Sequence, residues 1–87
     1  MKAWKTEIIE AVKAETEHAR IVSLKEIADA QGIRHITRQD TRDIMIAVQK
    51  AVPGYKAVRL EKTPHDSLFQ SLCFVESGVE FDDEEEI

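Results

Sequence analysis

The chain has 87 residues, 43% of them hydrophobic and 33% charged, which suits one small soluble domain. No apolar run approaches the roughly 18 residues that would span a membrane, and the charged N-terminal stretch does not resemble a signal peptide. Cys73 is the only cysteine, which excludes an internal disulfide and favours a reducing cytoplasm.

The net charge of −5 is unevenly distributed along the chain. Residues 1–77 hold all 12 Lys and Arg against 11 Asp and Glu, whereas residues 78–87 hold six acids and no base. Within the first part, residues 34–62 hold seven basic and three acidic side chains. We therefore expect a domain at 1–77 that contains a mildly basic segment, followed by a disordered acidic tail at 78–87.

The first predicted helix covers residues 3–19. Apolar side chains between Trp4 and Ala19 recur every three or four positions, which places them on one face of a helix, and charged side chains occupy the rest. We expect that face to be buried. Trp4 is expected in the core, with a contact between two copies of the chain as the alternative.

A second, shorter helix is predicted at 24–31. Ser23 and Glu26 have the spacing of a capping box, in which each side chain accepts a hydrogen bond from the other residue's backbone N–H. Gly32 would end the helix, because glycine tolerates the left-handed conformation found there. The residues just before it, Ile21 and Val22, could form a very short strand.

The third predicted helix covers residues 38–52. Thr37 is its N-cap, and Asp40 stands three residues later, where a carboxylate interacts favourably with the helix dipole. Pro53 and Gly54 end the helix. The stretch "GIRHIT" connects it to the second helix.

Two β-rich runs, "YKAVRLEK" and "SLFQSLCFVE", predict an antiparallel hairpin with strands at 55–61 and 68–76. The loop "TPHD" separates them. In the first strand, Val58 and Leu60 share a face that we take as inward. Both faces of the second strand are apolar, so its inward face stays open. The expected core contains Ile8, Val12, Leu24, Ile27, Ile44, Val48, Val58 and Leu60.

Three helices followed by a hairpin resemble the winged helix-turn-helix superfamily, over about residues 4–76. The resemblance is one of architecture. It implies a helix-turn-helix made of the second and third helices, with the third helix in the major groove and the hairpin loop against the DNA backbone. It also implies a small regulator of a bacterial or phage type that binds double-stranded DNA as a monomer or homodimer.

Carried over by position, the resemblance places Arg38, Gln39 and Arg42 near base edges, because Arg hydrogen-bonds guanine and Gln adenine. Arg34 in the connector could hold phosphate, as could backbone N–H groups at the start of the third helix. The hairpin and its loop would contribute further basic contacts from Lys56, Arg59, Lys62 and His65.

Two acids interrupt this basic pattern. Asp40 and Asp43 stand between the arginines, where they could pair with Arg42 and the helix terminus or could weaken phosphate binding. The alternative is a protein-binding module or inhibitor on the same scaffold. These charges would then form its solvated face, and its acidic tail would engage a partner or mimic nucleic acid.

A protein partner would use different residues. Ile46 lies outside the core stripe of the third helix and could anchor a partner, although a single exposed Ile is ordinary. The tail could be solubilising disorder, a competitor for the basic segment, or a docking strip for a basic partner. Its acids are Asp82, Asp83, Glu84, Glu85 and Glu86.

Nothing in the sequence points to an enzyme. His18, His35 and His65 lack the spacing of a metal site, and we expect no cofactor or metal. Cys73 falls inside a predicted strand, where a small buried apolar role is expected of it. No phosphate-binding glycine motif or nucleophile motif is present.

Overall fold

The computed structural model describes residues 3–60, 63–79 and 85–86. These residues form an α+β domain, which confirms the α+β part of the expected fold. In chain order the elements are α1 (Ala3–Thr16), β1 (Ile21–Ser23), α2 (Leu24–Ala30), α3 (Arg38–Ala51), β2 (Tyr55–Arg59), α4 (Leu68–Ser71), β3 (Leu72–Glu76) and β4 (Glu85–Glu86).

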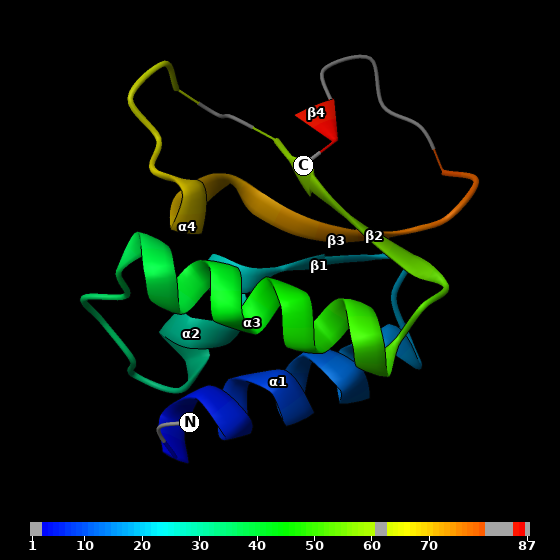
Figure 1. Ribbon diagram of the computed structural model, residues 1–87, viewed down its shortest axis with the longest axis horizontal. Coiled ribbons are helices and arrows are strands. Elements are labelled where there is room, and N and C mark those ends of the chain that lie inside the picture. Colours follow the sequence, from blue (N-terminus) through cyan, green and yellow to red (C-terminus); the bar gives the residue numbers. More distant parts are fainter. Residues whose placement is uncertain (1–2, 61–62, 80–84, 87) are drawn as a thin grey trace.

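The strands form one antiparallel sheet in the order β1-β3-β2-β4. The very short strand before α2 therefore exists, and it pairs with β3, which is far away in sequence. Phe74 of β3 lies opposite Val22 of β1 on one side and Ala57 of β2 on the other. In Figure 1, α1, α2 and α3 lie together on one side of the sheet.

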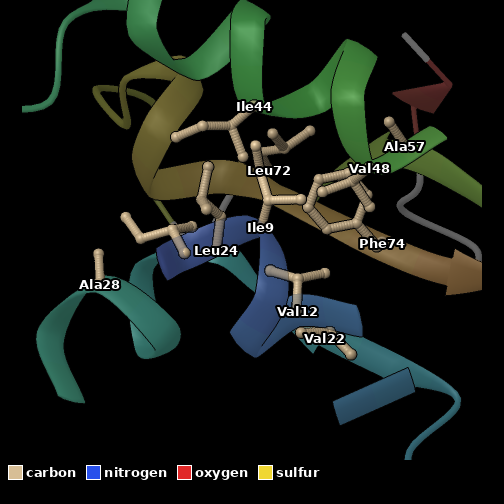
Figure 2. Packing of buried hydrophobic residues seen from close by; sticks show 11 residues of the cluster. Ile9, Val12, Val22, Leu24, Ala28, Ile44, Val48, Ala57, Leu72 and Phe74 are labelled. Atoms are coloured by element: carbon tan, nitrogen blue, oxygen red, sulfur yellow. The ribbon is translucent and has the colours of Figure 1, made fainter. Parts of the chain in front are cut away.

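The core fills the space between these three helices and the facing side of the sheet (Figure 2). Phe74 is its largest fully buried side chain. Burial confirms Ile8, Val12, Leu24, Ile44 and Val48 as core residues; Val58 is also fully buried but is not part of this cluster. Ile27 is partly buried and packs against the core, as expected, whereas the partly buried Leu60 does not join it.

The inward face assigned to β2 is wrong. Side chains alternate between the two faces of a strand, and Ala57 is the residue that joins the core beside Phe74 (Figure 2). Val58 is fully buried but points to the opposite face of the sheet. The inward face was predicted wrongly because the small side chain of Ala57 gives a weaker apolar signal than that of Val58.

Helix α1 ends at Thr16, three residues before the predicted end. The hydroxyl of Tyr55 on β2 lies within hydrogen-bonding distance of the carbonyl oxygens of Thr16 and Ala19. These two carbonyl oxygens accept from the Tyr55 side chain and not from the backbone N–H groups of a further helical turn. The last turn is thus replaced by a contact that fixes the end of α1 to β2.

The second β-rich run is strand only from Leu72 onward. Its first residues form α4, a single helical turn closed by a capping box in which Ser67 and Gln70 each accept from the other's backbone N–H. Ser71 is fully buried and donates to the carbonyl oxygen of Ser67 at 2.8 Å. The predicted strand at 68–76 is therefore corrected to a helical turn followed by β3.

The acidic tail is not wholly disordered. Glu85 and Glu86 form β4, which pairs with the outer edge of β2, opposite Arg59 and Val58 respectively. The expectation of a disordered tail is therefore wrong for these two residues. Asp82, Asp83 and Glu84 lie outside the described residues.

Candidate nucleic-acid interface

Helix α3 presents a polar face to solvent. Its buried side chains, Thr41, Ile44 and Val48, recur at helical spacing and face the core. The opposite face carries exposed residues, the first three of which are the predicted base-reading residues: Arg38, Gln39, Arg42, Ile46 and Lys50. Arg38 and Arg42 are four positions apart, so they lie one above the other along this face. The structure therefore brings the three predicted base-reading residues together.

The acids of α3 are bound by α1. Lys5 is only 6% exposed, and its Nζ lies 2.7 Å from Asp40 Oδ1 and 2.9 Å from Asp43 Oδ2. Neither acid pairs with Arg42, so that part of the expectation is wrong. Within the part of the chain that the structure describes, Arg38 and Arg42 form no ion pair. Both guanidinium groups therefore remain available to solvent or to a ligand.

The lysine changes how these acids titrate. Its hydrogen bond, supported by bonds from Thr37, lowers the pKa of Asp40 to about 2. Hydrogen bonds from Lys5 and then Gln39 lower the pKa of Asp43 as well. In turn, its bonds to Asp40 and then Asp43 raise the pKa of Lys5 above the usual 10.5. All three groups are therefore charged at neutral pH.

The start of α3 is already capped. Thr37 Oγ1 accepts from the backbone N–H of Asp40 at 3.0 Å, and Asp40 Oδ2 accepts from the N–H of Thr37 at 3.3 Å. Two of the N–H groups at this terminus are thus occupied from within the chain. The N–H groups of Arg38 and Gln39 belong to the same first turn and do not take part in this box.

The connector between α2 and α3 holds its polar residues outward. Ile33 and Ile36 are partly buried against the core and anchor the segment. Arg34 and His35 between them are exposed, and His35 adopts a left-handed backbone conformation with φ of 61°. The connector thus places exposed basic groups just before α3.

The basic residues of the hairpin have varied roles. Arg59 donates from Nε to Ser71 Oγ at 3.1 Å and from its terminal amino group to the carbonyl oxygen of Asp66 at 3.1 Å. It therefore ties β2 to the following loop, and its predicted contact with DNA stays a prediction. Lys56 is half-buried and alternates with Ala57, so it points away from the helices.

The loop itself carries one exposed predicted residue. Asp66 accepts hydrogen bonds from both the backbone N–H and the hydroxyl of Thr63, which closes the loop as a compact turn. His65 is exposed within this turn. Lys62 lies outside the described residues.

The predicted partner residue Ile46 is 50% exposed. It lines a shallow hollow of about 290 Å³ together with Asp43, Ala47 and Lys50, all from α3. This hollow belongs to the same exposed face of α3 as Arg42, which stands four positions before Ile46. Glu85 and Glu86, also assigned to a partner, lie instead along the edge of β2.

Sequence reasoning missed Lys5, which controls the acids of this face. One signal for it was present: Lys5 stands four and seven positions before Ile9 and Val12, on the buried side of α1. A lysine at such a position requires an acidic partner across the helix interface. Which acid it meets depends on the packing of α1 against α3.

The described residues contain neither a cluster of metal-binding side chains nor a membrane-spanning helix. No group of three or more His, Cys, Asp and Glu side chains in the described ranges could hold a metal ion. No helix within them is long and apolar enough to cross a bilayer. Comparison with known proteins finds no family model, no curated protein and no solved structure that matches the chain.

Proposed function

We propose that the chain is a winged helix-turn-helix domain that binds double-stranded DNA through the outward face of α3. The proposed helix-turn-helix consists of α2, the connector and α3. The antiparallel strands β2 and β3 that follow, with the turn between them, correspond to the wing. This order of elements along the chain supports the proposal, as does the position of α1, α2 and α3 on one face of the sheet (Figure 1).

The observation that carries the proposal is the separation of charges on α3. Asp40 and Asp43 are both paired with the ammonium of Lys5, whereas Arg38 and Arg42 are exposed and form no ion pair among the described residues. A helix with two outward arginines one turn apart fits a major groove, where Arg hydrogen-bonds guanine or phosphate. Repulsion between the acids and phosphate is reduced because the ammonium of Lys5 lies against both carboxylates.

The direct test is a titration with a fluorescent duplex of mixed sequence at low salt, measured by anisotropy. We expect Arg38→Ala and Arg42→Ala each to weaken binding without lowering the melting temperature. Arg20→Ala is the matched control, because this exposed arginine lies 3.5 Å from Glu76 of β3 and is not on α3. It removes the same charge from a different surface.

Two results would contradict the proposal. The first is no binding to duplex at low salt, even after removal of residues 80–87 and their charge. The second is equal weakening by all three arginine variants, because this would mean that the duplex responds only to total charge.

A second candidate function is the recognition of a protein by the hollow around Ile46. Half of this large apolar side chain is exposed, beside the apolar Ala47 and the charged Asp43 and Lys50. An apolar anchor with a polar rim is typical of a protein contact. Capture of a protein from nuclease-treated lysate by the wild type but not by Ile46→Asp would favour this function over DNA binding.

A further inference from the structure

Gln39 is held in one orientation by Asp43. Gln39 Nε2 lies 2.9 Å from Asp43 Oδ1, one helical turn away on the exposed face of α3. An ionised carboxylate only accepts hydrogen bonds, so the amide nitrogen of Gln39 must face it. The reverse orientation would place two acceptors against each other. The carbonyl oxygen and one N–H of Gln39 therefore remain available to a ligand.

Asp43 is itself held in place from α1. Its Oδ1 accepts from Gln39, and its Oδ2 accepts from Lys5 Nζ at 2.9 Å. Lys5 is in turn bound by the buried Asp40 at the start of α3. The exposed amide is thus connected to a buried ion pair through one carboxylate, which limits the rotation of a side chain that would otherwise be free.

The groups left on Gln39 match one base. Adenine presents a donor, N6–H, and an acceptor, N7, in the major groove, and Gln binds them with its carbonyl oxygen and an amide N–H. We propose that Asp43 is a positioning residue that holds the amide of Gln39 in the orientation required to read adenine. This inference rests on the proposed binding of DNA by α3.

The experiment begins with selection of preferred duplexes from a random pool by the wild-type protein. The best duplex and versions with single A·T pairs changed to G·C are then titrated with wild type and variants. The measured quantity is discrimination, the ratio of the two affinities. We expect Gln39→Ala to lower it at one position by about 5- to 150-fold, the usual value of one bidentate base contact.

Three further variants separate orientation from charge. Asp43→Ala and Asp43→Asn both remove one negative charge, but only Asn retains an oxygen that can accept from Gln39. We expect Asp43→Ala to lower discrimination at the same base pair as Gln39→Ala, and Asp43→Asn to retain most of it. Asp29→Ala is the charge control, because Asp29 pairs with Lys25 on α2 and does not contact Gln39. It should leave discrimination unchanged.

The free protein provides a second readout. The side-chain amide signals of Gln39 in an NMR spectrum should shift in Asp43→Ala and stay in place in Asp29→Ala. The melting temperature checks that Asp43→Ala is folded, which we expect because Lys5 keeps Asp40 as a partner.

The outcomes separate this inference from the function on which it rests. If Gln39→Ala lowers discrimination and Asp43→Ala does not, the positioning role is wrong while DNA binding by α3 stands. The same holds if Gln39→Ala has no effect on discrimination. If the wild type binds no duplex, the proposed function is wrong and the inference fails with it.

Discussion

The two oxygens of Asp40 are divided between Lys5 and the start of its own helix. Oδ1 lies 2.7 Å from Lys5 Nζ of α1, and Oδ2 accepts from the backbone N–H of Thr37. One carboxylate thus closes the first turn of α3 and binds α3 to α1. Because both contacts require the ionised form, a single proton on Asp40 weakens the helix start and the helix interface together.

Acid should therefore destabilise the protein in a definite range of pH. The pKa of Asp40 is lowered from 3.8 to about 2 in the folded protein. A lowered pKa stabilises the fold above the unfolded value and loses that stabilisation as the pH falls toward the folded value. We expect the free energy of unfolding to decrease between about pH 4 and pH 2, as measured by urea denaturation at several pH values.

Asp40→Asn tests the source of that decrease. The amide cannot be deprotonated, so the variant should be less stable at pH 7 and should lose less stability on acidification than the wild type. Asp29→Asn is the control, since Asp29 belongs to an exposed pair with Lys25. Equal acid dependence in Asp40→Asn and wild type would show that the stability lost on acidification comes from other groups.

The two isoleucines of α3 should behave differently when they are shortened. Ile44 is fully buried and Ile46 is 50% exposed, although they are two positions apart. Ile44→Ala should cost roughly 2–5 kcal/mol of stability, the usual range for a core residue. Ile46→Ala should stay within about 0.5 kcal/mol of wild type. Similar losses in thermal or urea denaturation would contradict the observed burial.

Features set by neighbouring residues could be predicted from the sequence. The starts of α2 and α3 were predicted correctly, because an N-cap side chain accepts from a backbone N–H three positions later; α3 has the full capping box, whereas α2 has only the bond to Ser23. The start of α4 has the same signal in Ser67 and Gln70, but the Leu and Phe between them favoured a strand. Two local preferences competed at this point, and the capping box prevailed.

Features that depend on packing could not be predicted. Nothing near Lys5 in the sequence identifies Asp40 and Asp43 as its partners, and nothing near Thr16 indicates that Tyr55 will bind its carbonyl oxygen. The same limit applies to the candidate site. The exposure of Arg38 could be predicted from helical spacing. The hydrogen bond from Arg59 to the carbonyl oxygen of Asp66 could not, because it depends on where the loop folds.

The dependence of DNA binding on salt should report the number of phosphates bound. The logarithm of affinity falls with the logarithm of salt concentration by about 0.9 for each phosphate neutralised. A variant that loses one phosphate contact should therefore have a slope smaller by about 0.9. We expect this of Arg34→Ala, in the connector. Gln39→Ala should keep the wild-type slope, and anisotropy titrations at several salt concentrations measure both.

The acidic segment should oppose DNA binding. Part of it, β4, is paired with β2, and removal of residues 80–87 takes the net charge from −5 to +1. We expect the shortened chain to bind nonspecific duplex more tightly, with the largest gain at low salt, because charge repulsion is screened by ions. The fold should remain. The strand β4 pairs with β2 at Val58, whose side chain points to the face of the sheet away from the core.

A full-length chain with Asn or Gln in place of the six acids separates charge from strand pairing. If it binds duplex as tightly as the shortened chain, charge is the cause of the weaker binding. If only the shortened chain gains affinity, the cause is the strand itself at the edge of β2. Unchanged affinity in both chains would show that the segment does not oppose DNA binding.

The position of Trp4 gives the α1–α3 contact its own optical signal. Trp4 is the only tryptophan of the chain, and the ammonium of Lys5 lies 5.8 Å from the centre of its ring. The light emitted by an indole depends on charges close to it. The emission spectrum of the unlabelled protein should therefore follow the separation of Lys5 from its acids during acidification. Compared with circular dichroism of the same sample, it would show whether this contact opens before the helices unfold.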